Sequence, residues 1–225
     1  YPTRPVTQPF LMGQLGYNPN YAQPGFDLLE AQVRLHRAGW RPGKDGIREK
    51  DGQPLAFSLV AQDSAEYASV AKMLADQWRR VGASVDLVLR DSDEFQAALA
   101  GHSYDALLYG ISIGPDPDVF VYWDSTQFDA RSPKLNFSEY KSVMADTALE
   151  SGRTRSDRAL RIIKYEPFLR AWRDDAPAVG LYQPRFFYVS RGSVYGLSER
   201  TINTDVDRFK NVHNWMIRTI RVSQQ

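Results

Sequence analysis

The most reactive pattern in the sequence is Gly110-Ile111-Ser112-Ile113-Gly114, which has the Gly-x-Ser-x-Gly spacing of a nucleophile elbow. In such an elbow the small residues allow a sharp turn, and the serine hydroxyl is presented for attack on a carbonyl carbon. Asp174, Asp175 and His213 follow Ser112 in the chain order that an acid and a base of such a site require. One hypothesis is therefore acyl transfer at Ser112.

The residues that follow Ser112 favour another role for the same loop. A nucleophile elbow needs a helix that begins at the serine, and Pro115 and Pro117 interrupt the start of such a helix. Nor does a His-Gly-Gly type segment, which would supply an oxyanion hole, lie upstream. Small residues also let the backbone approach a ligand or a neighbouring strand closely. We expect this second role, with an α/β hydrolase using Ser112 as the alternative.

Carboxylates and aromatic residues extend the same loop. Asp116, Asp118 and Asp124 lack the spacing of an EF-hand loop, so the Asp-Pro pairs predict turns and no metal site. Two prolines stiffen the loop, and a rigid loop binds a ligand with a small ordering cost. Tyr122 and Trp123 follow it and are candidates either for lining a cleft or for packing in the core. We expect no cofactor.

The composition is ordinary for a packed globular protein. Of 225 residues, 43% are hydrophobic and 24% charged, and the 28 basic and 27 acidic side chains are interleaved, which argues against nucleic-acid binding. The absence of cysteine excludes thiolate metal sites and cysteine nucleophiles. The longest apolar run, 106–111, is too short to span a membrane. The chain opens with Tyr1-Pro2-Thr3, without a signal region, so we expect a mature or excised segment.

Strands and helices alternate in the first half of the chain, as in a parallel α/β sheet. Apolar patterns predict strands over 55–60, 85–89 and 104–111 and helices over 27–38, 63–81 and 92–100. Asp27 and Asp63 are the expected N-caps of the first two helices, and residues 43–53 are expected to form a charged loop.

The second half predicts helices over 138–150 and 156–174, strands over 178–182 and 186–190, and a last strand near 212–217. Pro167 should kink the second of these helices. Ligands of parallel sheets meet the loops at the carboxyl ends of the strands. These loops are 61–64, 90–93 and 112–118. The candidate ligand-binding residues in and after them are Gln62, Asp63, Ser112, Gly114, Asp116, Asp118, Tyr122 and Trp123.

The order of several short motifs is similar to that of family 5 extracellular solute-binding proteins, the peptide and nickel binders of ABC importers. Each motif is weak, but together they span nearly the whole chain. They are Tyr17-Asn18-Pro19, Phe26-Asp27, Arg37-Ala38-Gly39-Trp40, 71–82 with Trp78, Ser103-Tyr104-Asp105, Asp116-Pro117-Asp118, 136–140, Asp174-Asp175-Ala176-Pro177, Ser193-Val194-Tyr195-Gly196 and 208–215.

The resemblance implies a type II periplasmic-binding-protein fold, with a central mixed, mainly parallel sheet flanked by helices. Residues 1–26 would be a hinge-like opening segment, 27–203 the C-terminal ligand-binding lobe, and 204–225 a tail returning towards a first lobe outside this sequence. Two lobes would close over a small solute and deliver it to ABC permease subunits. The protein would not be an enzyme, and it would act in the periplasm or, tethered, at the outer face of the membrane.

The resemblance also bears on the ligand, for which an oligopeptide is expected before a sugar or a metal chelate. Peptide-binding relatives carry a carboxylate just after the third strand, and the corresponding stretch 110–114 has none. Dipeptide binders use an arginine in the loop after the first strand, and 61–64 lacks one. Both departures argue against a simple dipeptide. Asp116 could replace the missing acid, although an unpaired carboxylate in a closed cleft would be costly.

Overall fold

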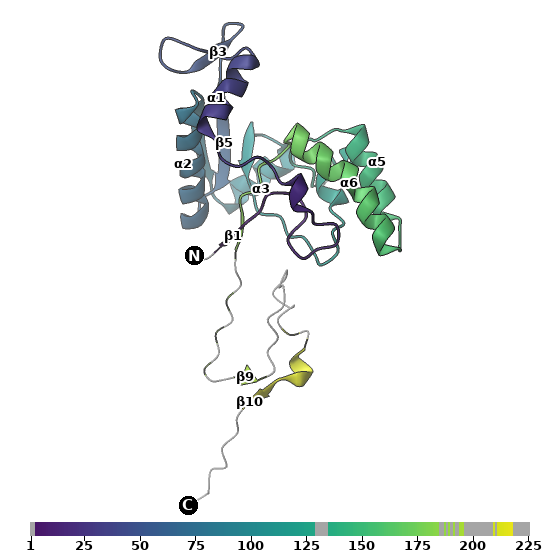
Figure 1. Cartoon of the computed structure of the whole chain (residues 1–225). Helices are drawn as coiled ribbons and strands as arrows, with labels where there is room; N and C mark the ends of the chain where they lie inside the picture. The colour runs from purple at the N-terminus through teal and green to yellow at the C-terminus, as the bar shows by residue number, and fades with distance from the viewer. Residues whose placement is uncertain are drawn as a thin grey trace, which may run out of the picture. The chain divides into compact units, whose positions relative to one another are not determined.

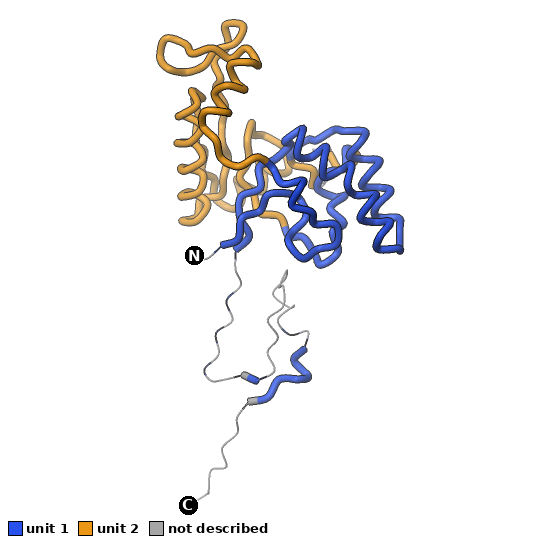
Figure 2. The backbone as a smooth tube through the Cα atoms, viewed as in Figure 1, with its two compact units in different colours: residues 1–23, 112–125, 138–225 blue, residues 24–111, 126–137 orange. Residues whose placement is uncertain are grey.

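The computed structural model describes residues 3–128 and 135–184, together with 187, 189, 191, 194–195, 209 and 211–217. The chain divides into two compact units, coloured in Figure 2. Unit 1 comprises residues 1–23, 112–125 and 138–225, and unit 2 comprises 24–111 and 126–137. Each unit brings together segments that are distant in the sequence.

Unit 2 is built on a parallel sheet. Strand β5 (Ala56–Gln62) lies in the centre, flanked by β6 (Ser84–Arg90) and β7 (Ala106–Leu108), and both pairings are parallel. The inner residues of β5 are apolar and closely packed, with Leu59 1% exposed. The predicted α/β arrangement is confirmed for this unit, although β7 is shorter than the predicted strand over 104–111.

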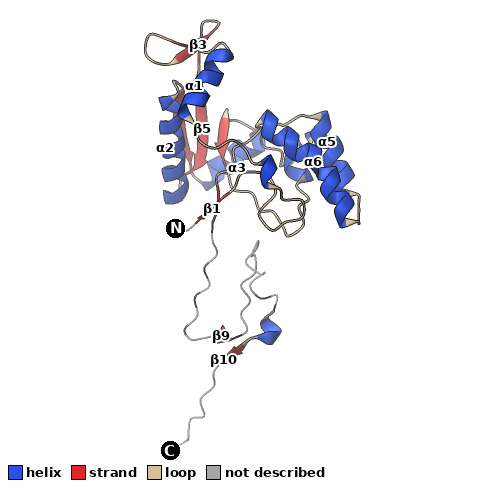
Figure 3. Cartoon of the chain, viewed as in Figure 1, coloured by secondary structure: helices blue, strands red, loops and turns tan. Residues whose placement is uncertain are grey.

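Helices cover the strands of this sheet, as Figure 3 shows for α2 beside β5. The helices of unit 2 are α1 (Leu28–Arg37), α2 (Ala65–Arg80) and α3 (Ser92–Gly101). Asp27 caps α1 as predicted, because its carboxylate accepts a hydrogen bond from the Glu30 amide at 2.9 Å. The rings of Phe57 on β5 and Trp78 on α2 meet edge to face, with centroids 5.2 Å apart.

The predicted cap of α2 is wrong by one residue. Ser64 is the N-cap, and its hydroxyl accepts from the Tyr67 amide at 3.3 Å. The Asp63 amide instead donates to the Arg90 carbonyl at 2.6 Å. Asp63 therefore continues the pairing of β5 with β6, and the helix starts after it.

The charged loop predicted over 43–53 is confirmed over 43–47 and 51–52, and its other residues belong to a small antiparallel sheet. Its strands are β2 (Arg41–Pro42), β3 (Arg48–Lys50) and β4 (Gln53–Pro54). Arg48 is 8% exposed, and its guanidinium donates to the carbonyls of Val81 at 2.7 Å and Trp40 at 3.0 Å. Strands this short carry no apolar alternation, which is why the sequence pattern did not reveal them.

Unit 1 is mainly helical around a core of large side chains. Its described elements are β1 (Thr3–Pro5), a 3-10 turn η1 (Pro19–Tyr21), α4 (Phe120–Trp123), α5 (Val143–Arg153), α6 (Arg158–Asp175), β8 (Tyr182–Pro184), β9 (Val194–Tyr195), a second 3-10 turn η4 (Val212–Asn214) and β10 (Met216–Ile217). A further 3-10 turn, η2 (Ser125–Gln127), begins at Ser125, which is the last residue of the segment 112–125 of unit 1. Helix α6 continues through Pro167.

Helices α5 and α6 lie side by side in Figure 1 and pack closely at Gly152. A Cβ atom at Gly152 would overlap the ring of Tyr165, which is fully buried. Phe10 from the opening segment meets the same ring edge to face at 5.2 Å. The absence of a side chain at Gly152 therefore lets the two helices and the opening segment share one core.

Short antiparallel pairs join distant parts of unit 1. Strand β1 pairs with β8 and places Arg4 opposite Gln183. Strand β8 occupies the end of the predicted strand over 178–182 and extends two residues beyond it, while the strand predicted over 186–190 falls largely outside the described residues. The predicted last strand is reduced to β10, which pairs with β9 and follows η4. The tail predicted from 204 is described at 209 and 211–217.

Within the described residues, no helix has the length and apolar character needed to cross a membrane.

We predict that Gly152→Ala lowers the free energy of unfolding by about 1–3 kcal/mol, because the added methyl group overpacks the α5–α6 contact. Urea titration followed by circular dichroism would measure this change. Gly25→Ala is the matched control, since a Cβ at Gly25 meets no atom within 4 Å. Equal midpoints for the two variants would contradict the proposed packing constraint.

Candidate functional site

The carboxyl edge of the unit 2 sheet carries the first two predicted site residues. Gln62 is the last residue of β5, and its amide donates to the Ser92 hydroxyl at the start of α3 at 3.1 Å. Asp63 follows it, exposed to solvent and fixed through its backbone to Arg90 at the end of β6. The edge is therefore ordered by contacts between β5, β6 and α3, as expected where parallel strands end.

Two tyrosines that the sequence did not single out lie at the same edge. A Cβ atom at Gly110, two residues after β7, would lie 2.7 Å from the Tyr67 hydroxyl oxygen. Tyr109 is 41% exposed, and its ring meets Phe137 edge to face at 5.0 Å. The periodic pattern placed Tyr67 on an apolar helix face and Tyr109 inside a strand, so neither looked like a surface group. The one feature of the sequence that could have indicated this polar edge is Gly110, a glycine between β7 and the loop.

Neutral hydrogen-bonding groups lie at this edge beside charged ones, which include Asp63 and the ion pair of Arg90 with Glu94. Burial raises the pKa of Tyr67, with smaller contributions from Glu66 and Tyr109, so its hydroxyl stays protonated at neutral pH. Gln62 adds an amide, which can both donate and accept. Such groups suit a ligand that presents amide or hydroxyl groups, without requiring a charge on it.

In unit 1, Asp116 is held by an arginine of the same unit. Arg161 on α6 donates two hydrogen bonds to the carboxylate, both at 2.7 Å, in a bidentate pair. The Asp118 amide donates to the same carboxylate at 3.0 Å. The hydrogen bonds from Arg161 hold the pKa of Asp116 below its usual range. The Asp116 carboxylate is therefore not unpaired, because Arg161 on α6 is its partner.

Asp118 ties the loop to the other long helix. Its carboxylate lies 3.1 Å from a guanidinium nitrogen of Arg153 on α5 and accepts from the Phe120 amide at 3.2 Å. The Arg153 guanidinium also lies 4.2 Å from the centre of the Phe120 ring, in a cation–π contact. Both loop carboxylates therefore position the backbone.

The backbone carbonyls of the same loop are also engaged. The Tyr122 hydroxyl donates to the Ser112 carbonyl at 2.9 Å, and the Gln14 amide donates to the Gly114 carbonyl at 2.6 Å. Gln14 is 9% exposed, so its hydrogen bond to Gly114 is a buried contact between the loop and the opening segment. The Ser112 side chain remains on the surface. Of the two roles considered for Trp123, packing is the one observed, because its ring is 8% exposed and meets Trp172 at 5.7 Å.

The nucleophile-elbow geometry is not formed at Ser112. No helix begins there, since the next helix is α4, eight residues later. Of the acids considered, Asp175 accepts a hydrogen bond from the Tyr140 hydroxyl at 2.6 Å, and Asp174 pairs with Arg173 at 2.8 Å. His213 lies in the 3-10 turn η4 and not in a strand. Among the described residues no cluster of three or more His, Asp or Glu side chains could hold a metal ion.

The eight predicted site residues thus fall into two groups. Gln62 and Asp63 lie together at the sheet edge of unit 2, and the other six belong to unit 1. Residues 2–132 match the family of bacterial extracellular solute-binding proteins, family 5 Middle. The chain belongs to this family.

Relatives of known name agree with this assignment. Protein XP55 of Streptomyces lividans is 30% identical over 176 residues, which cover 75% of this chain and 30% of that protein. The nickel-binding periplasmic protein of Escherichia coli K12 is 31% identical over 101 residues, covering 43% and 19%. The chain spans about a third or less of the length of these relatives.

Solved structures confirm the fold as that of type II periplasmic binding proteins. NikZ from Campylobacter jejuni in complex with Ni(L-His) superposes with a TM-score of 0.76 at 24% identity, covering 95% of this chain and 43% of that one. The oligopeptide-binding protein AppA from Bacillus subtilis, in complex with a nonapeptide, has a TM-score of 0.74 at 20% identity, covering 96% and 43%. At these identities the likeness concerns the fold.

We predict that Asp116→Asn destabilises the protein by about 1 kcal/mol or less at pH 7, because the Asp116 carboxylate is largely exposed and solvent screens the pair. The folded pKa is lowered, so this stabilisation is present above the unfolded pKa of about 3.9 and is lost as the pH falls through the folded value. Urea unfolding of both proteins between pH 7 and pH 2.5 would measure it.

The control for this prediction is Asp76→Asn, which breaks an exposed pair with Arg79 within α2. Its cost at pH 7 should be smaller than that of Asp116→Asn. A penalty for Asp116→Asn that did not decrease on acidification would contradict a role based on the charge of Asp116.

Proposed function

We propose that this chain is the C-terminal lobe of a solute-binding protein that captures a solute outside the cytoplasm and delivers it to an ABC permease. The observation that carries the proposal is the sheet edge of unit 2, where Gln62, Tyr67 and Tyr109 gather polar groups at the strand ends. In parallel sheets this edge is where ligands bind. Membership of the solute-binding family supports the same role. The protein would bind its ligand without chemical turnover.

An oligopeptide is the ligand that we infer for this edge. Peptide backbones present amide donors and acceptors whatever their side chains, and the Gln62 amide and the tyrosine hydroxyls are suited to them. Two mycobacterial oligopeptide-binding proteins are 25% identical over 142 residues, which supports the inference. A metal chelate or a sugar is the alternative, since neighbours in fold were solved with Ni(L-His) and with mannohexaose.

The loop 112–118 would act as a rigid contact for the ligand. Asp116 and Asp118 are engaged by arginines, so we propose that they shape the loop and that Ser112 and Gly114 offer its surface to the ligand. A positively charged amino group of the ligand would then pair with a carboxylate elsewhere in the whole protein. This proposal differs from the hypothesis of the sequence analysis, in which Asp116 replaces the carboxylate that peptide-binding relatives carry after the third strand.

The mechanism proposed for the whole protein is closure of two lobes over the solute. Residues 1–26 would form the hinge-like opening, 27–203 the C-terminal lobe, and 204–225 a return towards the other lobe. A closed form recognised by the permease follows when the ligand binds that form more tightly than the open one. The protein would work in the periplasm or, tethered, at the outer face of the cell membrane.

We predict that the whole protein, purified gently from the cells that make it, retains a solute visible by native mass spectrometry. A mixture of short peptides is the expected result. Retention of a chelate or an oligosaccharide would keep the transport role and change the ligand class. An empty protein that hydrolysed esters, and whose Ser112 reacted with a fluorophosphonate probe, would refute the binding role.

We predict that Gln62→Ala in the whole protein weakens binding of the retained solute about tenfold, which is the loss expected for one buried hydrogen bond. Isothermal titration calorimetry would measure the dissociation constant. Gln96→Ala, an exposed position on α3, is the control and should leave it unchanged. Equal affinities for the two variants would remove Gln62 from the site.

A further inference from the structure

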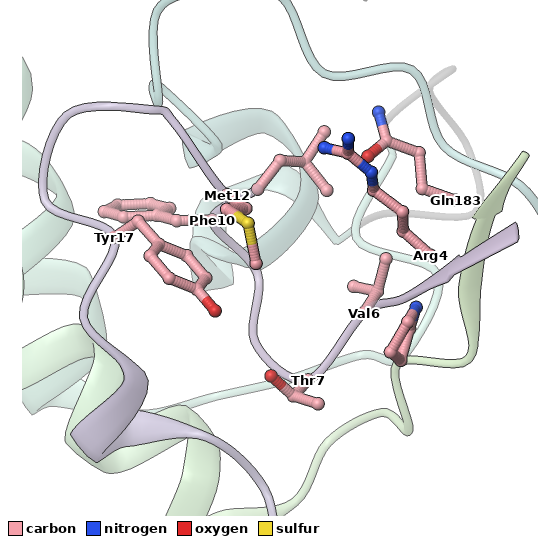
Figure 4. A pocket seen from close by; sticks show the side chains of 9 residues that line it. Arg4, Val6, Thr7, Phe10, Met12, Tyr17 and Gln183 are labelled. Atoms are coloured by element: carbon pink, nitrogen blue, oxygen red, sulfur yellow. The ribbon is translucent and has the colours of Figure 1, made fainter. Parts of the chain in front are cut away.

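Unit 1 contains a pocket whose lining does not include residues of the loop 112–118. It has a volume of about 230 Å³ and lies between the β1–β8 pair and the opening segment. Its lining residues, shown in Figure 4, are Arg4, Pro5, Val6, Thr7, Phe10, Leu11, Met12, Tyr17 and Gln183. Ligand pockets for drug-sized molecules measure about 300–1,000 Å³, so this one suits a molecule the size of a single residue.

The two ends of the pocket differ in chemistry. Arg4 and Gln183 lie at one end, directly opposite each other on paired strands, so that their side chains are neighbours. Phe10 and Tyr17 lie at the other end, with Met12 between the two ends (Figure 4). The pocket thus joins a polar end to an apolar floor.

The polar end carries one uncompensated positive charge. None of the described residues that line the pocket is acidic. Among the residues that the structure describes, Arg4 makes no ion pair and the Gln183 amide makes no hydrogen bond. A guanidinium presents several donors in a plane and matches the two oxygens of a carboxylate.

The apolar floor is held in place by buried contacts. Phe10 is 1% exposed and packs against Tyr165 and Phe168 of α6. Buried Gln8 donates to the Asn18 carbonyl at 2.9 Å and fixes the far side of the opening segment. Because these contacts fix Phe10 before any ligand arrives, binding against its ring carries a small ordering cost.

We propose that this pocket binds a small apolar carboxylic acid. The carboxylate would be held by the Arg4 guanidinium and the Gln183 amide. The hydrocarbon part would lie against Val6, Phe10 and Met12. Such a group occurs both in free branched-chain acids and at the C-terminus of a peptide that ends in leucine. The lining residues belong to unit 1, whereas the sheet edge proposed to bind the transported solute belongs to unit 2, and the test does not depend on that proposal.

The experiment uses the four methionines of the chain as probes. Met12 lines the pocket, whereas the other three lie on α2, α5 and β10. With ¹³C-methyl methionine in the 225-residue chain, N-acetyl-leucine should produce a saturable shift of the Met12 signal, assigned through Met12→Leu. N-acetyl-leucinamide, which lacks the negative charge, should bind at least about tenfold more weakly.

Two substitutions test the polar end without removing the apolar floor. Arg4→Gln and Gln183→Glu should each weaken N-acetyl-leucine at least about tenfold, the second by placing a negative charge beside the carboxylate. Arg80→Gln, on the exposed end of α2, is the control and should bind as the unaltered chain does. Equal affinities for acid and amide, no effect of either substitution, or no Met12 shift would each overturn the proposal.

A second acid distinguishes the two sources of the ligand. If 4-methylpentanoate binds as tightly as N-acetyl-leucine, the pocket recognises a free acid. If N-acetyl-leucine binds at least about tenfold more tightly, the amide next to the carboxylate contributes and a peptide end is favoured. Both results support a carboxylate site, and neither involves Gln62 or the loop 112–118.

Discussion

The bidentate pair between Asp116 and Arg161 is the contact on which unit 1 depends for the shape of its loop. Asp116 is exposed, so the pair adds little to the free energy of folding. Its geometry matters more, because two parallel hydrogen bonds fix both the direction and the rotation of the carboxylate. Asp118 forms a single ion pair with Arg153 on α5, so the two long helices hold one loop at two adjacent points.

This constraint changes how the loop can serve a ligand. A carboxylate that already has a guanidinium partner is a poor counter-ion for an incoming amine, because breaking the existing pair would expose an uncompensated charge. The loop offers instead a stiff surface of small residues, while unit 2 offers neutral hydrogen-bonding groups at its sheet edge. These properties suit the recognition of backbone-like polar groups better than the recognition of a charged terminus.

Much of the fold could be predicted because local patterns carry it. The alternation of apolar runs with amphipathic helices predicted the parallel sheet that β5, β6 and β7 form, and Asp27 was identified as a cap from its spacing to Glu30. The errors lie where the pattern is short or depends on a distant partner. The small sheet β2–β4 has no apolar alternation, and the cap of α2 moved to Ser64 because the Asp63 backbone pairs with β6.

The sequence by itself determined the family, the α/β class and the loops at the strand ends, because spacing and periodicity are properties of neighbouring residues. Tertiary structure decided the roles of individual side chains. Asp116 became a positioning group because Arg161, 45 positions away, reaches it, and Trp123 became a core residue because Trp172 packs on it. Tyr67 and Tyr109 meet at one edge for the same reason. Such pairings follow from chain reversal in space, which no local pattern encodes.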